Sequence, residues 1–380
     1  MNELVSLLKE FEENPNASDL HLGGGKPPKI RYNSNLKIMR DEIIDKEKIK
    51  EFIHQIIGLR FDKDEVDKKM KELKELGQID LSIELPGNNR SRVNIAKSLG
   101  TYAIVMRKIP QIIPSVETLG FQPSHLELLK KNVALKEGII LITGQTGSGK
   151  STTLAALLNH VNKTYDKNIV TIEDPVEFIF DEEGATSFIQ KEVGPDTKDF
   201  ASGLRAALRE DPDIIMIGEI RDEETAMKAM EAAQTGHIVL ATLHTNSAAD
   251  TVSRVLGMFP ESKEGQIREI LASTLKVVLS QKLAPRITSG RILVYELMLN
   301  NQPISNLIAS GNYSNIQRTM LAGREEGMIT MENNLAHLVK EQIITPQIAL
   351  EYANLKKDLE RKIEIENDSN MNTLVGGKLV

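Results

Sequence analysis

The chain reads Gly138-Ile-Ile-Leu-Ile-Thr-Gly-Gln-Thr-Gly-Ser-Gly-Lys150-Ser151 near its middle. The apolar start of this stretch predicts a buried strand, and the residues that follow predict a helix. Between the two, Gly144 to Ser151 fits the pattern G-x-x-x-x-G-K-[ST], a glycine-rich turn that joins a strand to a helix. In such a turn the main-chain N–H groups bind phosphate, assisted by the positive N-terminal end of the helix. The stretch therefore predicts a nucleoside triphosphate site in an α/β fold.

The side chains of this turn have separate expected roles. Lys150 reaches the β- and γ-phosphates, and the Ser151 hydroxyl ligates Mg²⁺. Proteins that bind guanine usually carry Asn-Lys-x-Asp, whereas Asn162-Lys-Thr-Tyr165 lacks the final aspartate, so ATP is favoured. The alternative interpretation is a structural turn with an incidental lysine. The residues expected to contact nucleotide here are Gly144, Gln145, Thr146, Gly147, Ser148, Gly149, Lys150, Ser151 and Thr152.

Short apolar runs alternate with helical patterns around this turn. Alternation of this kind predicts a parallel-rich sheet with helices on both faces. The predicted strands are Gly138 to Thr143, Ile169 to Ile172, Ile214 to Ile217, Ile238 to Leu243 and Ile292 to Leu297. The predicted helices are Gly149 to Asn162, Lys198 to Arg209, Glu223 to Gln234 and Ala248 to Leu256.

Carboxylates follow two of the predicted strands, where an α/β sheet has its ligand edge. Glu219 ends an apolar strand and is a candidate catalytic and Mg²⁺-binding acid, or else a surface glutamate. Thr171-Ile-Glu-Asp-Pro-Val-Glu177 places three carboxylates after another strand. We expect Glu177 to be the base that activates the attacking water and keep Glu173 as the alternative. An acidic cap for a following segment is the simpler interpretation.

Two histidines flank the predicted strand Ile238 to Leu243. His237 and His244 are seven residues apart, so they point to opposite faces of a strand and do not share a metal. His244, at the far end, is better placed to sense a γ-phosphate. A structural role is the alternative for His237.

Bulk composition narrows the possible partners. The net charge of −7 gives no electrostatic reason to expect nucleic acid. The chain has no cysteine, which excludes disulfides and thiolate metal sites. Residues 1–15 are amphipathic and acidic, unlike a signal peptide, and no apolar run has the roughly 20 residues needed to cross a bilayer. Membrane association is therefore expected only through partners.

The order of these segments resembles the secretion ATPase superfamily, most closely the PilT-type retraction ATPases of type IV pili. The matching stretches are Ala17-Ser-Asp-Leu-His-Leu22, Arg90-Ser-Arg-Val-Asn94, Gly144 to Ser151, Thr171 to Glu177, Ala206 to Asp213, Gly218-Glu-Ile-Arg-Asp222 and Thr235 to Thr245.

Three prolines between Ile109 and Pro123 predict an interdomain linker over 111–123, and the residues before it are typical of a small α+β domain. The resemblance implies that this domain, over 1–110, is PAS-like and that residues 124–300 form a RecA-like P-loop NTPase core. A helical C-terminal region over 301–362 and a disordered tail over 363–380 complete the expected domains. The resemblance also implies that Arg90, Arg92 and Arg107 approach nucleotide in a homohexameric ring. Such a ring is cytoplasmic and acts on an inner-membrane pilus platform protein.

The sequence contains features that favour retraction of the pilus over its assembly and one that does not. Pilus assembly and type II secretion-type ATPases usually have a longer N-terminal extension and a four-cysteine zinc site, which this chain lacks. However, the retraction family's Ala-Ile-Arg-Asn-Leu-Ile-Arg-Glu is replaced by Pro303-Ile-Ser-Asn-Leu-Ile-Ala-Ser310. Retraction is the main expectation. An assembly ATPase, a RecA-like nucleic-acid translocase and a nucleotide switch without turnover are the alternatives.

Overall fold

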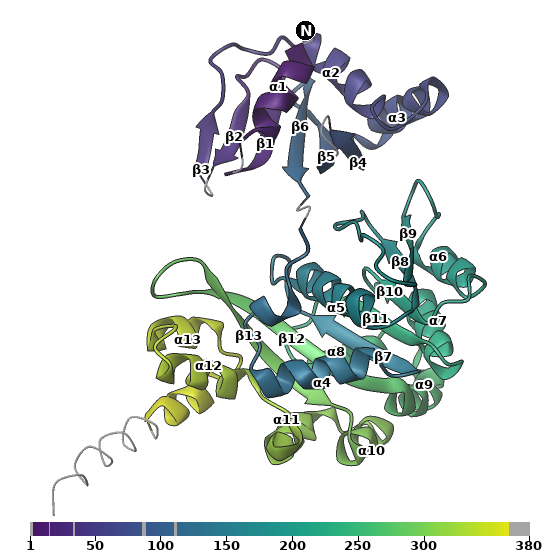
Figure 1. Cartoon of the computed structure of the whole chain (residues 1–380), viewed down its shortest axis with the longest axis vertical. Coiled ribbons are helices and arrows are strands. Elements are labelled where there is room, and N and C mark those ends of the chain that lie inside the picture. Colours follow the sequence, from purple (N-terminus) through teal and green to yellow (C-terminus); the bar gives the residue numbers. More distant parts are fainter. Residues whose placement is uncertain (1–2, 15, 33–34, 86–88, 110–111, 365–380) are drawn as a thin grey trace, which may run out of the picture. The chain divides into compact units, whose positions relative to one another are not determined.

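The computed structural model describes residues 3–14, 16–32, 35–85, 89–109 and 112–364 (Figure 1). The chain divides into two compact units. The first comprises Met1–Ile112 and Pro175–Ile179, and the second comprises Ile113–Asp174 and Phe180–Val380. From residue 365 onward, the tail expected to be disordered lies outside the described residues.

The first unit contains, within its described residues, an antiparallel sheet of six strands in the order β3-β2-β1-β6-β5-β4. One face of the sheet is apolar and shares a single core with the three helices. The other face is polar because side chains alternate along each strand. The elements are α1 Glu3–Glu12, β1 Ala17–Gly23, β2 Lys29–Tyr32, β3 Asn35–Ile38, α2 Lys48–Ile57, α3 Lys63–Leu76, β4 Gln78–Leu85, β5 Asn89–Ser98 and β6 Thr101–Lys108.

The second unit is built on a mixed sheet, which has seven strands in the part of the chain described here, in the order β13-β12-β7-β11-β10-β8-β9. All neighbouring strands are parallel except β12 and β13, which are antiparallel. The strands are β7 Gly138–Thr143, β8 Asn168–Glu173, β9 Ser187–Glu192, β10 Ile214–Ile217, β11 Ile238–Leu243, β12 Leu275–Pro285 and β13 Arg291–Leu299. The predicted α/β fold is confirmed.

Helices cover this sheet. The α-helices of the second unit are α4 Pro123–Val133, α5 Lys150–Thr164, α6 Phe200–Ala207, α7 Glu223–Gln234, α8 Ala248–Leu256, α9 Glu261–Thr274, α10 Gln302–Ser310, α11 Ile316–Ala322, α12 Met331–Lys340 and α13 Pro346–Tyr352. Short 3-10 helices are η1 Val116–Thr118, η2 Tyr313–Asn315 and η3 Gly323–Glu326. Helices α6 to α11 share a core with one face of the sheet, whereas α5 contacts β7 and α4. Helices α12 and α13 pack on β12 and β13.

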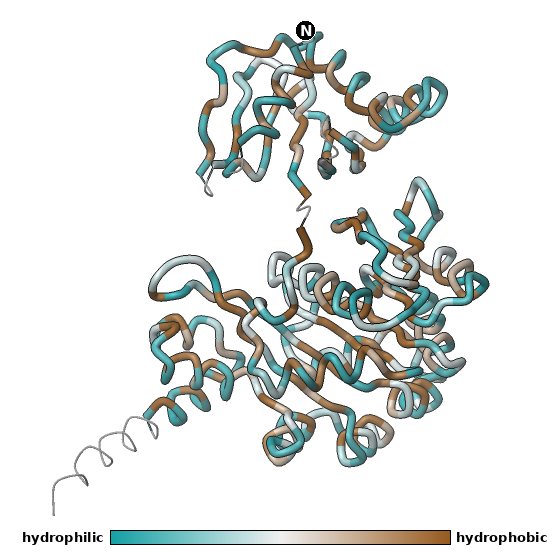
Figure 2. The backbone as a smooth tube through the Cα atoms, in the orientation of Figure 1, coloured by the Kyte–Doolittle hydropathy of each residue, from teal (hydrophilic) through white to brown (hydrophobic). Residues whose placement is uncertain are grey.

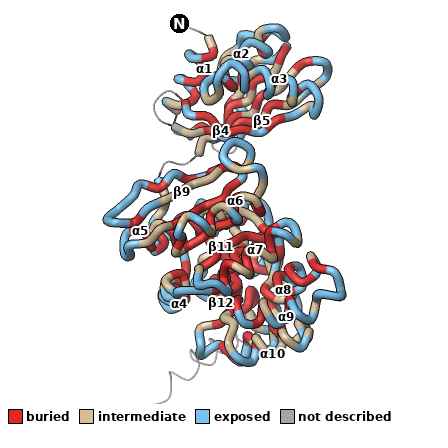
Figure 3. Tube along the Cα trace, turned by 90° about the vertical axis from the view of Figure 1, so that its right-hand side faces the viewer, coloured by how far each residue is buried: buried red, intermediate tan, exposed pale blue. Residues whose placement is uncertain are grey.

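The central strands form the driest part of the second unit. Every residue of β7, β10 and β11 is buried. Figure 2 shows these strands as hydrophobic, and Figure 3 shows β11 as buried. A parallel strand with helices on both sides is apolar along its whole length. This rigid centre fixes the positions of the loops that leave its carboxyl edge.

Several predicted elements are confirmed. Strands β7, β10 and β11 and helices α7 and α8 have the bounds expected from the sequence. Strands β9 and β12 and helices α4 and α9 were not predicted.

Candidate nucleotide-binding site

The loop between β7 and α5 has the geometry of a phosphate cradle. Lys150 is buried, with 9% of its surface exposed. Its Nζ donates to the carbonyl oxygens of Gly144 at 2.8 Å and Gln145 at 3.3 Å. Among the described residues, the buried Ser148 Oγ has no hydrogen-bond partner. A buried cation and an unsatisfied hydroxyl at the N-terminal end of a helix fit an anionic phosphate chain.

Glycine is required at two positions of this loop. The φ of Gly144 is +146°, and a Cβ there would lie 2.3 Å from the carbonyl oxygen of Gln281. Gly149 precedes the first turn of α5 at a φ of 91°. Gln281 on the adjacent strand β12 also holds the loop, since its Nε2 donates to the Ser148 carbonyl oxygen at 3.0 Å. The cradle is thus held by a neighbouring strand as well as by its own turn.

The structure brings Glu219 and His244 together at the carboxyl edge of the sheet. Glu219 follows β10, and His244 follows the adjacent strand β11. His244 Nε2 lies 3.4 Å from Glu219 Oε1. On the other side, Arg221 binds Glu219 Oε2 through Nε and Nη2, each at 2.8 Å. The Glu219 carboxylate is 20% exposed and is therefore accessible while its orientation is fixed.

The two candidate bases occupy different environments. Glu173 is the last residue of β8 and is 7% exposed. Its Oε1 accepts a hydrogen bond from Thr171 Oγ1 at 2.7 Å and one from Gln190 Nε2 at 3.4 Å. Glu177 is exposed and belongs to the segment grouped with the first unit. Glu173 therefore shares a unit with the phosphate cradle, whereas Glu177 does not.

His237 contacts the main chain, which is consistent with the structural alternative. Its Nδ1 lies 2.9 Å from the Ala232 carbonyl oxygen and fixes the turn between α7 and β11. Within the described residues, no three His, Asp or Glu side chains are grouped to hold a metal ion.

The three predicted arginines lie on the polar face of the first unit's sheet. Arg92 on β5 is paired in register with Arg107 on β6, and Arg90 lies two residues before Arg92. Arg107 Nε donates to Asp19 at 2.7 Å. Burial by itself would raise the pKa of Asp19, but hydrogen bonds from Ser18 and Arg107 outweigh it and lower that pKa. Asp19 thus holds one of the three guanidinium groups in place.

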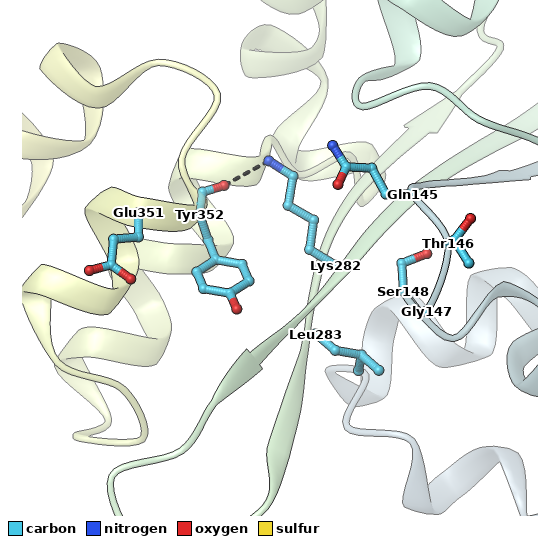
Figure 4. A pocket seen from close by; sticks show the side chains of 8 residues that line it. All are labelled: Gln145, Thr146, Gly147, Ser148, Lys282, Leu283, Glu351 and Tyr352. Carbon is cyan, nitrogen blue, oxygen red and sulfur yellow. Dashed lines mark hydrogen bonds between the residues drawn. The ribbon is translucent and has the colours of Figure 1, made fainter. Parts of the chain in front are cut away.

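A cavity beside the cradle contains residues that no sequence motif had indicated. It has a volume of about 340 Å³ and is lined by the loop together with Lys282, Leu283, Glu351 and Tyr352 (Figure 4). Lys282 is one hint in the sequence, since it follows Ser280 and Gln281 and these three polar residues interrupt an apolar run. Helix α13, which supplies the other wall, lies some 200 residues from the loop in sequence. It falls in the region predicted to be helical, but nothing in that pattern links it to the loop.

In the described part of the chain, no helix combines the length and the apolar character needed to cross a membrane.

The family described as "Type II/IV secretion system protein" matches residues 5–350. The "Type IV pilus retractation ATPase PilT" of Pseudomonas aeruginosa is 37% identical over 354 residues, covering 93% of this chain and 99% of that protein. A "Twitching motility protein" of Neisseria gonorrhoeae is 41% identical over 274 residues, which are 72% of each protein.

A solved structure agrees with these sequence matches. The "Crystal Structure of the Pilus Retraction Motor PilT and Bound ADP" superposes with a TM-score of 0.84 at 38% identity, covering 94% of this chain and 98% of that one. The resemblance to PilT-type ATPases is therefore confirmed in both sequence and fold. Because the family match extends over most of its length, the chain belongs to the type II/IV secretion system protein family.

Proposed function

We propose that the chain is a type IV pilus retraction ATPase that hydrolyses ATP at the loop between β7 and α5. The observation that carries the chemistry is the buried Lys150 in a loop with an unsatisfied Ser148 hydroxyl. In this proposal the second unit is a RecA-like core with a helical C-terminal region. The first unit is a PAS-like domain joined to it by a linker over 111–123.

The catalytic roles follow from the chemistry of phosphoryl transfer. Lys150 exchanges its carbonyl partners for the β- and γ-phosphates, and the loop amides bind the remaining oxygens. Ser151 and Glu219 hold Mg²⁺, which needs only one or two protein oxygens beside phosphates and water. This ion would neutralise charge on the phosphates. His244, which contacts Glu219, senses the γ-phosphate.

Water attacks the γ-phosphorus while the bond to the ADP oxygen breaks, and the water's proton passes to a carboxylate. We assign that role to Glu177 because its exposed carboxylate can approach a solvent water. Glu173 is the alternative, since it shares a unit with the cradle but already accepts from Thr171 and Gln190.

The first unit contributes positive charge to the reaction. We propose that Arg90, Arg92 and Arg107 approach the phosphates in a homohexamer, where they stabilise the negative charge of the transition state. Their common face of the sheet supports a shared role.

The cellular role rests on the relatives. A retraction ATPase aligned over 99% of its length supports pilus disassembly and twitching motility as the output. The proposed partner is the pilus platform protein of the inner membrane, with this chain on the cytoplasmic side. Neither DNA nor RNA is expected as a partner.

A deletion strain complemented with the wild-type or the Lys150→Ala gene tests this function. Loss of retraction predicts excess surface pili and no twitching, with rescue by the wild-type gene only. A strain without pili would instead indicate assembly.

In the purified protein, Glu177→Gln should abolish phosphate release at unchanged ATP affinity. Full turnover by Glu177→Gln and none by Glu173→Gln would assign the base to Glu173.

A further inference from the structure

The loop between β11 and α8 carries His244, the residue to which the proposed function gives the γ-phosphate sensor role. The His244 side chain is exposed, and its Nε2 lies 3.4 Å from Glu219. The next residue, Thr245, is buried, and its Oγ1 lies 2.7 Å from Oγ1 of Thr251 on α8. The position of His244 therefore depends on how the main chain of this loop is held rather than on burial of its ring.

A residue that follows α13 binds the same loop. Asn354 donates from Nδ2 to the carbonyl oxygen of Asn246 at 3.1 Å. Asn246 lies two residues after His244, so this contact restrains the main chain that carries the histidine. The two asparagines are 108 residues apart in the sequence. The contact thus connects the last helices of the second unit to the carboxyl edge of its sheet.

Lys282 on β12 determines which way the Asn354 amide points. Its Nζ donates to Asn354 Oδ1 at 2.7 Å and to the Tyr352 carbonyl oxygen at 2.8 Å, the second of which is drawn in Figure 4. An ammonium has three donors and no acceptor, so it binds the oxygen of the amide and not the nitrogen. With its oxygen toward Lys282, the Asn354 side chain presents its NH₂ group to Asn246.

A buried acid fixes the main chain of Asn354 as well. Glu332 on α12 is fully buried, and its Oε1 accepts from the amides of Asn354 at 3.1 Å and Leu355 at 2.8 Å. The side chain and the main chain of Asn354 are therefore both bound. A donor held in this way is preorganised, because little conformational freedom remains to be lost when it holds the loop.

We propose that Asn354 is a positioning residue for the γ-phosphate sensor, holding the loop after β11 so that His244 stays directed at that phosphate. The inference rests on the proposed function, in which His244 senses the γ-phosphate. It gives the segment after α13 a part in distinguishing ATP from ADP, because ADP has no γ-phosphate for His244 to contact.

The test compares ADP with the β,γ-imido analogue of ATP, which has a γ-phosphate and is not hydrolysed. Calorimetric titrations of the full chain with Mg²⁺ measure both affinities. Asn354→Asp keeps the oxygen that accepts from Lys282 and loses the donor to Asn246. We expect it to bind the analogue about three- to tenfold more weakly, as for loss of one net hydrogen bond, with ADP affinity unchanged. Asn354→Ala loses both contacts and should show at least the same selective loss.

Asn300→Asp is the matched control. Asn300 is also a half-buried asparagine whose Nδ2 donates to main-chain oxygens, those of Ala272 and Leu275, each at 2.8 Å. None of these residues belongs to the loop after β11. The control should leave the affinities for both nucleotides unchanged, and thermal unfolding without nucleotide checks that each variant is folded.

A double-mutant cycle with His244→Ala separates positioning from general stabilisation. Once the sensor is removed, Asn354→Asp should weaken binding of the analogue no further. Three results would overturn the inference and leave the proposed function intact: equal loss of analogue and ADP binding, no loss of either, or a full additional loss beside His244→Ala. Equal affinity of wild type and His244→Ala for the analogue, or a wild type that binds neither nucleotide, would contradict both proposals.

Discussion

A buried acid behind the candidate site gives the chain a predictable pH response. Glu296 on β13 is 2% exposed. Its Oε1 accepts from the Ala248 amide at 2.7 Å, and its Oε2 accepts from the Met331 amide at 3.3 Å. These are the first residues of α8 and α12, so one carboxyl group joins two helix N-termini. Burial, with a contribution from the nearby Glu332, raises the pKa of Glu296 to about 7 despite the two amide donors.

The raised pKa of Glu296 makes the free energy of unfolding depend on pH. The pKa rises from an ordinary 4.5 to about 7, so the folded state favours the protonated carboxyl. The stability contributed by this group is complete below the unfolded pKa and is lost as the pH rises through the folded pKa. Two and a half pKa units correspond to about 3 kcal/mol in total, of which roughly 2.5 kcal/mol falls between pH 5 and pH 8.

The assay is urea unfolding at pH 5 and pH 8 for wild type and Glu296→Gln, followed by circular dichroism. Glutamine cannot titrate, so the difference between the two proteins isolates this one group from all others. The wild type should lose about 2.5 kcal/mol more than the variant over this pH interval. An identical pH dependence in both proteins would refute the reasoning, because Glu296 would then be ionised in the folded state.

Three further outcomes are expected. Gly147→Ala should lower the free energy of unfolding by about 1–2 kcal/mol from its positive φ alone. Gly144→Ala should lower it further and abolish ATP binding, because the added Cβ would meet main-chain atoms. Equal thermal midpoints for the two variants would contradict this. Asp19→Asn should lower the free energy of unfolding at pH 7 by about 1 kcal/mol. The loss is small because solvent screens the largely exposed Arg107, and it should vanish at acid pH, where Asp19 is protonated. Glu219→Gln should raise the Mg²⁺ concentration that gives half-maximal turnover about 10–100-fold, measured by phosphate release over a Mg²⁺ series. An unchanged half-saturating Mg²⁺ concentration would contradict the assignment of Glu219 to the metal site.

The sequence predicted the centre of the second unit well because the signals there are local. The P-loop pattern specifies its own turn, and strands such as β10 and β11 are apolar throughout because both faces are covered. The same patterns placed Glu219 and His244 at one edge, where the structure finds them in contact. Site residues that follow a strand are predictable because the carboxyl ends of parallel strands share an edge.

The residues that the sequence did not reveal depend on tertiary partners. Strand β12 contains Ser280, Gln281 and Lys282, which interrupt its apolar pattern. Ser280 Oγ accepts from Thr143 Oγ1 at 2.8 Å, and Gln281 donates to the cradle, so both are satisfied only in the folded chain. Glu296 likewise looks like a surface acid until α8 and α12 present their amides to it. Polar residues of this kind cannot be assigned to a core before their partners are known.

Calorimetric titration of the folded chain with MgATP tests the central claim most directly. We predict saturable binding by the wild type and at least about tenfold weaker binding by Lys150→Ala, which loses the buried cation. Wild-type protein that gives no binding heat at any temperature tested, or Lys150→Ala protein that binds as tightly as wild type, would contradict the assignment of this loop as the nucleotide site.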